Sequence, residues 1–328
     1  MKVWTGDDAL QLRLTERPVL ALGFFDGVHR GHQALVRRAV TDARRQGRQA
    51  GVLTFDPHPQ AVLWPACRLE YLTTRAEKME LLSGLGLEVA VIYPFSPALA
   101  ELSPEAFVRR ILVGQLGVGE VVVGYNFTFG ARGAGRYGLL RELGKGNGFT
   151  AVVIPPVTVG RRVVSSTAIR ERLLEGRVEE AGRMLGYAYS LAGKVRSGSG
   201  RGRRLGFPTA NLEVEPGKLI PADGVYLAGA RLWGEETDRL AVVAVGKALT
   251  FGAEQDRVEV HLVDFAGDLY GSELRIRFHR RLRGMRRFPG AEELQAQMKE
   301  DLRRAKALGL PEGRGNAAQA PQAFLYTG

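Results

Sequence analysis

The sequence predicts a doubly wound, mostly parallel α/β domain, followed by a small antiparallel β-barrel and a C-terminal helix. In the first half, short apolar runs alternate with segments of helical periodicity, which is typical of a parallel sheet. In the second half, strand patterns follow one another without intervening helices, which is typical of an antiparallel barrel. We expect domains over residues 1–187 and 188–310, with a flexible tail over residues 311–328.

Five apolar runs of the first half are predicted strands. Each is short and rich in aliphatic or β-branched side chains, as expected for strands buried on both faces of a parallel sheet. They span residues 19–22, 50–55, 88–93, 120–123 and 150–154. Right-handed crossovers between such strands place helices on both faces of the sheet.

The helices between these strands are predicted from spacing and capping. Residues 33–48 repeat apolar side chains at helical spacing, and Gly47 is a natural C-terminal stop. Thr74 and Glu77 fit a capping box for a helix that ends near residue 85. Shorter helices are expected over residues 103–112 and 178–188.

The second half begins with residues 191–204, which are dense in Gly, Ser and Arg, a composition typical of linkers. A helix over residues 291–308 has an apolar face. Predicted strands span residues 224–232, 240–245, 257–265 and 273–278.

Residues 275–287 contain seven arginines, a density that would suit a nucleic acid. Strand alternation places Ile276 and Phe278 on one face and the arginines at 275 and 277 on the other. A solvated basic face of the barrel therefore explains these arginines better than a nucleic-acid site.

Composition excludes several classes of protein. The single cysteine among 328 residues excludes an intramolecular disulfide framework and a cysteine metal cluster. No apolar run approaches the roughly 20 residues of a membrane span, and the first residues lack a signal-peptide pattern, so we expect a cytoplasmic protein. The net charge of +11 fits nucleic acid, an anionic substrate or a bias in base composition, and does not choose among them.

The turn after the first predicted strand is a candidate phosphate site. It contains Gly23, Asp26 and Gly27, and then His29-Arg30-Gly31-His32 before a predicted helix. A strand, a Gly-containing turn and a helix start bring free N–H groups to the positive end of the helix dipole. ATP phosphates would fit there, with the two histidines as extra donors. An ordinary strand–helix turn is the alternative.

Other polar segments follow the remaining strands at their carboxyl ends, where ligands of such sheets bind. The structural alternatives are an exposed loop for His58 and core packing, rather than a flavin-stacking wall, for Phe127 and Phe129. Ser166 and Thr167 also suit helix capping. The segments are His58 with its flanking prolines, residues 124–130 and residues 165–170.

Five motifs, taken together and in order, resemble the bifunctional riboflavin kinase/FAD synthetase family of bacteria. Each motif is short, but the ordered set is highly specific and extends over about residues 15–309. The resemblance implies a Rossmann-like nucleotidyltransferase domain followed by a riboflavin-kinase-like barrel. The motifs read GFFDGVHRGH (23–32), LTFDPHP (53–59), GYNFTFG (124–130), SSTAIR (165–170) and GRRLGFPTANL (202–212).

The resemblance implies that the first domain is an FMN adenylyltransferase, which makes FAD and pyrophosphate from FMN and ATP. His29 and His32 would hold the ATP phosphates and stabilise the charge that develops as pyrophosphate leaves. The other implied ATP or phosphate contacts are Gly23, Phe25, Asp26, Gly31, Arg162, Ser166, Thr167 and Arg170. The implied flavin contacts are His58, Pro59, Asn126, Phe127 and Phe129.

The resemblance implies that the second domain is a riboflavin kinase, in which Glu259 is the catalytic base. Thr209 and Asn211 of the PTAN motif would bind Mg²⁺ and the nucleotide phosphates, and oxygen donors of this kind suit Mg²⁺. The Gly-rich phosphate loop would include Gly198, Gly202 and Arg203. Phosphoryl transfer depends on positioning and electrostatic stabilisation, which these residues can supply.

Three kinase-half residues depart from the family pattern. Ala244 and Leu249 stand where the family usually has Asn and Pro, and Met285 stands where a Glu is usual. One alternative is therefore an FMN adenylyltransferase whose barrel binds flavin but is weakly active or inactive as a kinase.

A second alternative is a basic RNA-binding regulator. The lack of a basic platform interleaved with aromatic residues counts against it. We expect a bifunctional enzyme that uses riboflavin, FMN and ATP with Mg²⁺. It would be monomeric or weakly homo-oligomeric, with no nucleic-acid or membrane partner.

Overall fold

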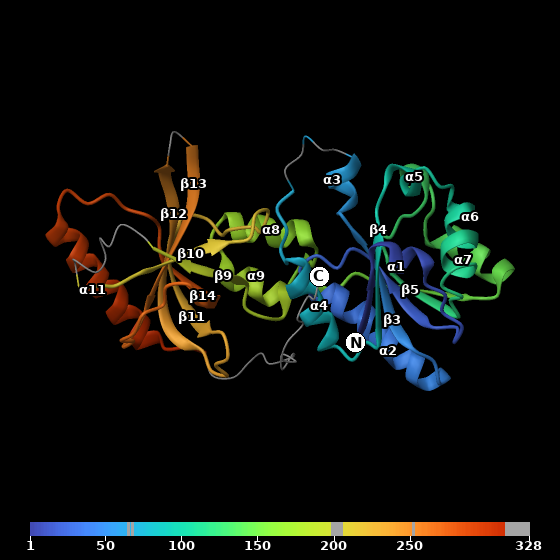
Figure 1. The fold of residues 1–328 in the computed structure, drawn as a ribbon, viewed down its shortest axis with the longest axis horizontal. Coiled ribbons are helices and arrows are strands. Elements are labelled where there is room, and N and C mark those ends of the chain that lie inside the picture. Colours follow the sequence, from blue (N-terminus) through green and yellow to red (C-terminus); the bar gives the residue numbers. More distant parts are fainter. Residues whose placement is uncertain (64–65, 67–68, 198–205, 251–252, 312–328) are drawn as a thin grey trace. The chain divides into compact units, whose positions relative to one another are not determined.

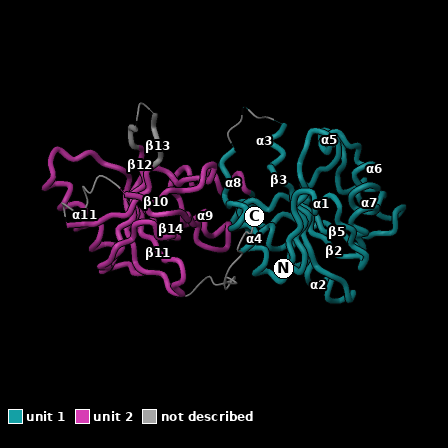
Figure 2. Tube along the Cα trace, viewed as in Figure 1, with its two compact units in different colours: residues 1–165, 316–328 teal, residues 166–315 magenta. Residues whose placement is uncertain are grey.

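The computed structural model describes residues 1–63, 66, 69–197, 206–250 and 253–311. These residues form two compact units, the first comprising residues 1–165 and the second beginning at residue 166 (Figure 2). The predicted loop residues Gly198, Gly202 and Arg203, and the predicted tail from residue 312, lie outside the described residues.

The first unit is built on a six-stranded sheet, of which Figure 1 labels β3, β4 and β5. Every strand pair is parallel, and the order is β1-β4-β3-β2-β5-β6. From β2 the chain proceeds outward to β3 and β4, and it then returns to the other side of β2 with β5. The strand order therefore reverses between β2 and β5, which is where doubly wound sheets bind ligands. The strands are β1 Lys2–Thr5, β2 Val19–Leu22, β3 Ala50–Asp56, β4 Val89–Pro94, β5 Glu120–Gly124 and β6 Thr150–Ile154.

Helices cover both faces of this sheet because successive strand residues enter opposite cores. Leu20 and Leu53 belong to one core with residues of α1, α6 and α7, while Ala21 and Val52 belong to the other with α2 and α4. The helical segments are α1 Gly6–Gln11, α2 Arg30–Gln46, α3 Pro59–Leu63, α4 Arg75–Ser83, α5 Pro97–Ala100, α6 Pro104–Phe107, a π-helical turn Val108–Val113, a 3₁₀ turn Ala131–Gly133 and α7 Tyr137–Asn147. A small hairpin follows, with strands β7 Thr158–Val159 and β8 Arg162–Val163.

The second unit contains a closed antiparallel barrel in the order β10-β13-β12-β11-β14-β9. Ile276 and Phe278 are buried, as strand alternation predicts. Both halves thus confirm the predicted fold class. The elements are α8 Ser166–Leu174, α9 Val178–Leu185, β9 Ser190–Arg196, β10 Ala210–Val214, β11 Gly224–Leu232, β12 Arg239–Thr250, β13 Ala253–Leu262, β14 Glu273–Arg283 and the C-terminal helix α11 Ala291–Leu308.

Strand β9 occupies the beginning of the stretch whose composition is typical of linkers. Gly193 pairs with Val214 of β10, and a Cβ at Gly193 would lie 1.9 Å from the Glu213 carbonyl oxygen. The glycine therefore permits a close approach of two barrel strands, which explains why a strand here looks like a flexible segment.

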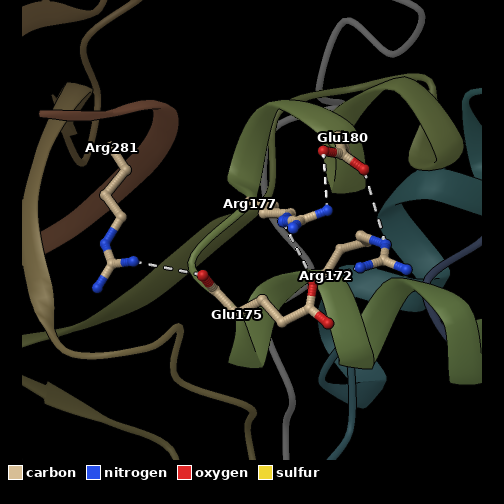
Figure 3. Close-up of polar contacts among 5 residues, drawn as sticks. All are labelled: Arg172, Glu175, Arg177, Glu180 and Arg281. Carbon is tan, nitrogen blue, oxygen red and sulfur yellow. Dashed lines mark hydrogen bonds and ion pairs between the residues drawn. The ribbon is translucent and has the colours of Figure 1, made fainter. Parts of the chain in front are cut away.

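The end of helix α8 is attached to the barrel half of the chain by hydrogen bonds. The Ala222 backbone N–H donates to the Leu173 carbonyl at 3.0 Å, and Arg281 donates to the Glu175 carbonyl at 3.3 Å (Figure 3). The two compact units consequently meet at residues 165/166, whereas the predicted domains meet at 187/188. A compact unit and a functional domain need not end at the same residue. The predicted domain boundary at 187/188 therefore stays a prediction.

Candidate active sites

The turn after β2 holds two histidines in contact. His29 is the N-cap of α2, and its Nδ1 accepts the His32 backbone N–H at 3.3 Å. The two imidazole rings stack with centroids 3.6 Å apart. A Cβ at Gly31 would lie 3.1 Å from His29 Cε1, so glycine leaves room for the His29 ring against the helix start.

The buried side chain of Asp26, which is only 3% exposed, anchors the turn. Its carboxylate accepts the backbone N–H groups of Leu72, at 3.0 and 3.2 Å, and of Thr73, at 3.2 Å. Phe25 and Val28 adopt left-handed backbone conformations, with φ of 53° and 32°. Such conformations cost about 1–3 kcal/mol each, so the Asp26 bonds help to hold a strained turn in place.

The electrostatics of the turn favour a neutral His32. Burial lowers the pKa of His32 well below its usual value, and the neighbouring His29 and Lys78 lower it further. Burial also lowers the pKa of the Lys78 ammonium, against the opposing effect of Asp26 and Asp56. His32 Nδ1 is buried without a hydrogen-bond partner among the described residues.

Lys78 was not among the residues predicted from the sequence. It lies on α4, directly after Glu77 of the capping box, which is confirmed by the bond from the Glu77 N–H to Thr74 Oγ1 at 3.2 Å. Its sequence position reads as an ordinary helix cation. Only the packing of α4 against the turn brings its charge near His32.

The structure also brings together the turns after β2 and β3. The rings of Phe24 and His58 have centroids 4.7 Å apart, and Tyr71 lies 6.3 Å from His58. His58 is partly exposed, while the adjacent Pro59 is buried. The predicted flavin-side loop thus adjoins the predicted phosphate turn.

The segment after β5 has mixed exposure. Asn126 is exposed and Phe127 is partly buried. Phe129 is 6% exposed, and its ring lies 5.9 Å from both Phe127 and Phe107. This burial fits the core alternative for Phe129 and leaves Asn126 and Phe127 accessible to a ligand.

The remaining predicted phosphate residues of the adenylyltransferase half lie around the start of α8. Arg162 is exposed on β8 in the first unit, and α8 of the second unit begins at Ser166. Thr167 is exposed and Arg170 is partly exposed on that helix.

Arg172, one turn of the helix beyond Ala168, is buried and ties α8 to α9. It forms an ion pair with Glu175 and reaches Glu180 at 3.7 Å (Figure 3). The charged network is therefore built into the helix that carries Ser166, Thr167 and Arg170.

In the barrel, the predicted kinase residues are cross-strand neighbours. Asn211 of β10 lies opposite Glu259 of β13, and Ala244 of β12 lies opposite Glu259 on its other side. Thr209 is partly exposed just before β10. His261 Nδ1 lies 2.9 Å from the Pro208 carbonyl oxygen, which ties the PTAN segment to β13.

Arg257 contacts the predicted base, Glu259, and a predicted metal ligand, Asn211, and was itself not predicted from the sequence. Its Nε donates to Asn211 Oδ1 at 3.1 Å, and its Nη2 lies 2.5 Å from Glu259 Oε1. Its position two residues before Glu259 could have indicated that Arg257 lies at the site, because strand residues at i and i+2 share a face.

The donor set suits a cation that is bound partly by substrate. The Thr209 hydroxyl and the Asn211 amide are neutral oxygen donors, which Mg²⁺ accepts together with phosphate oxygens and water. The described part of the chain contains no cluster of three or more His, Cys, Asp or Glu side chains that could hold a metal by itself.

One of the three family departures, Ala244, lies beside a predicted kinase residue. Ala244 presents only a methyl group beside Glu259. Met285 is 54% exposed, and a Cβ at Gly246 would lie 3.4 Å from its Cε. The Leu249 side chain lies outside the described residues.

A hollow of about 470 Å³ lies elsewhere in the first unit, at the starts of β1 and β4, with Lys2, Trp4 and Val89 in its lining. None of the predicted site residues lines it. Among the described residues, no helix is long and apolar enough to cross a membrane.

Comparisons with known proteins separate the two halves. A family model described as FAD synthetase matches residues 12–168, and one described as riboflavin kinase matches residues 185–308. A solved structure described as a macrolide-efflux protein from Streptococcus pneumoniae has the same fold, with a TM-score of 0.86 and 31% identity over 93% of this chain and 99% of that chain.

Curated relatives match nearly the full length. A bifunctional riboflavin kinase/FMN adenylyltransferase from Listeria monocytogenes serovar 1/2a is 40% identical over 88% of this chain and 91% of its own. Relatives of the same description are 36% identical in Bacillus subtilis strain 168, over 88% of this chain and 92% of theirs, and 32% identical in Escherichia coli K12, over 92% and 96%.

Proposed function

The chain belongs to the bifunctional riboflavin kinase/FMN adenylyltransferase family, and from this premise we propose which residues perform each reaction. The enzyme phosphorylates riboflavin to FMN with ATP, and it transfers AMP from a second ATP to FMN, giving FAD and pyrophosphate. The assignment of residues below rests on the geometry of each half.

Adenylyl transfer is assigned to the turn after β2. A phosphate oxygen of FMN attacks the α-phosphorus of ATP, and the bond to the pyrophosphate oxygen breaks. This nucleophile is already anionic, so no strong base is needed. His29, His32 and the positive end of the α2 helix dipole hold the phosphates and stabilise the charge on the leaving pyrophosphate.

Further ATP and flavin contacts of the adenylyltransferase half are proposed. Gly23, Phe25, Asp26 and Gly31 shape the phosphate turn, and Lys78 adds positive charge beside it. Arg162, Ser166, Thr167 and Arg170 are proposed as a second phosphate-binding group. The proposed flavin contacts are His58, Pro59, Asn126, Phe127 and, at the buried margin, Phe129.

Phosphoryl transfer is assigned to the barrel. Glu259 accepts the proton of the ribityl 5′-hydroxyl while that oxygen attacks the γ-phosphorus of ATP and ADP leaves. Thr209 and Asn211 would hold Mg²⁺, which when bound neutralises phosphate charge. The observation that supports this assignment most directly is the cross-strand pairing of Asn211 with Glu259.

A time course with riboflavin and Mg·ATP tests the assignment. We expect FMN first and FAD later. His32→Ala should abolish FAD formation and spare FMN formation, while Glu259→Ala should do the reverse, with FAD still made from supplied FMN. Glu213→Gln, which alters an exposed carboxylate on β10, is the matched control and should change neither rate.

The second candidate function is adenylyl transfer alone, with a barrel that binds flavin and is weakly active or inactive as a kinase. Ala244 and Met285 favour it, because both depart from the family pattern. Ala244 lies opposite Glu259, and Met285 lies beside Gly246 of β12. Failure of the unaltered enzyme to make FMN, with FAD still formed from FMN, would establish this alternative. Loss of both activities from either single substitution in a folded protein would refute the two-site assignment.

The Mg²⁺ requirement, the cytoplasmic location and the monomeric or weakly oligomeric state stay predictions. Rates measured with and without chelator test the first, and cell fractionation tests the second. Light scattering of the purified enzyme gives the oligomeric state.

A further inference from the structure

We propose that Arg257 is a positioning residue of the kinase site. It holds the Glu259 carboxylate in place, and it releases the Asn211 side chain when the metal–nucleotide binds. The inference rests on the proposed function, in which Glu259 is the base and Asn211 a metal ligand.

One guanidinium bridges two barrel strands at this point. Its Nε donates to Asn211 Oδ1 at 3.1 Å on β10, while its Nη2 pairs with Glu259 Oε1 at 2.5 Å on β13. Asn211 and Glu259 are also direct cross-strand partners. The planar guanidinium fork stays charged and presents donors in fixed directions, so it can set the orientation of both acceptors at once.

The Arg257–Glu259 pair affects the orientation of the Glu259 carboxylate more than the stability of the barrel. The side chains of Arg257 and Glu259 are 39% and 28% exposed, and ion pairs with this much access to water stabilise a fold little. Replacing Arg257 should therefore leave the barrel folded. What is lost is the restraint on a carboxylate that has to meet one particular hydroxyl.

The bond to Asn211 conflicts with metal binding. The Arg257 Nε–H and a bound cation are both positive, and both seek the Asn211 oxygen, so their simultaneous presence is disfavoured. The pair with Glu259 carries no such conflict. Arg257 therefore keeps Glu259 oriented and competes with the metal–nucleotide for Asn211.

The first test is a double-mutant cycle on the full-length enzyme, with Arg257→Met, Glu259→Gln and both together. Arg257→Met should lower kcat for FMN formation about ten-fold and change KM for riboflavin little. In the Glu259→Gln background it should cost less than about two-fold, because Arg257 acts through Glu259. Arg257→Lys should recover part of the rate.

The matched control is Arg239→Met. Arg239 also forms an exposed ion pair on the barrel, with side-chain exposures of 45% and 28% in the pair with Glu235, and it should leave FMN formation unchanged. Equal losses from Arg257→Met with and without Glu259 would overturn the positioning role. No effect of Glu259→Gln would instead refute the proposed base, which separates the two failures.

The second test measures binding rather than turnover. The free enzyme is titrated with Mn²⁺·ADP, and unbound Mn²⁺ is followed by electron paramagnetic resonance. Arg257→Met should bind the complex about three-fold more tightly, because the competitor for Asn211 is gone. In an Asn211→Ala background the same substitution should give no gain. Equal or weaker binding by Arg257→Met would overturn the competition.

Discussion

The partly buried His32 links the phosphate turn to pH at the level of a single residue. Its ring stacks on His29, and its Nδ1 has no hydrogen-bond partner among the described residues. A proton on this ring would be desolvated and would lie near other positive charge, so the fold favours the neutral form. A bound triphosphate would oppose this effect with its negative charge.

The lowered pKa of His32 predicts acid destabilisation of the first unit. In the unfolded chain a histidine titrates near pH 6.5, whereas in the fold its pKa is lower, so the unfolded chain binds more protons below about pH 6.5. Stability should be full above that pH and fall as the pH decreases. Between pH 7 and pH 5 we expect a loss of about 1–2 kcal/mol.

Urea denaturation at a series of pH values measures this loss. His32→Gln, which cannot titrate, should remove most of the pH dependence. His279 lies in the barrel and its pKa is also lowered by burial, so His279→Gln is the matched control and should leave the pH dependence of the first unit's unfolding unchanged. An unchanged slope in His32→Gln would contradict the prediction.

At the scale of the element, α8 is held by a buried arginine. Arg172 is 6% exposed and pairs with Glu175 and with Glu180, whereas Arg177 pairs with the same two carboxylates from an exposed position (Figure 3). The two arginines share partners and differ in burial. Substituting each arginine in turn therefore distinguishes the effect of a buried charge from the effect of the ion pairs.

Arg172→Met should lower the free energy of unfolding by about 1–2 kcal/mol, since it removes the buried member of the network while the carboxylates can still be hydrated. Because α8 carries Ser166, Thr167 and Arg170, we also expect KM for ATP in FAD formation to rise several-fold. Thermal unfolding and separate assays of the two reactions measure these effects.

Arg177→Met is the control for that substitution. Its side chain is 53% exposed, so its loss should change stability by less than about 0.5 kcal/mol. Equal effects of the two substitutions would show that burial of Arg172 is irrelevant to α8.

At the scale of the whole molecule, the two reactions fall on different parts of one chain. The FAD synthetase model ends at residue 168, and the riboflavin kinase model begins at residue 185. Each proposed base, phosphate turn or metal ligand belongs to one reaction only. FMN is the product of one reaction and the substrate of the other, so it connects them.

This division predicts complementation between inactive variants. His32→Ala and Glu259→Ala enzymes should each fail to make FAD from riboflavin, while an equimolar mixture should succeed, because FMN released by one variant is adenylated by the other. Chromatography of the flavins measures the outcome. A mixture that makes no FAD, although each variant keeps its remaining activity, would contradict exchange of FMN between molecules.

Local patterns in the sequence predict the fold class, most strands and the order of the motifs. Strands 19–22 and 150–154 and the helix at 291–308 are confirmed to the residue, because each has a continuous local pattern bounded by clear stop signals. Strand β1 was missed because it lies at a sheet edge and has no buried residue, so it lacks the continuous apolar run that marks β2. Gly193 concealed β9, because the residue that permits close strand packing also typifies linkers.

Contacts between charged groups on distant segments could not be predicted from the sequence. Lys78 affects His32 from another helix, and Arg257 joins Asn211 to Glu259 across two strands. Phe129 has the same aromatic pattern as Phe127 in sequence, yet only Phe129 is fully in the core. Local sequence fixes backbone periodicity through short-range sterics, whereas these contacts depend on packing between distant segments and on the burial that results.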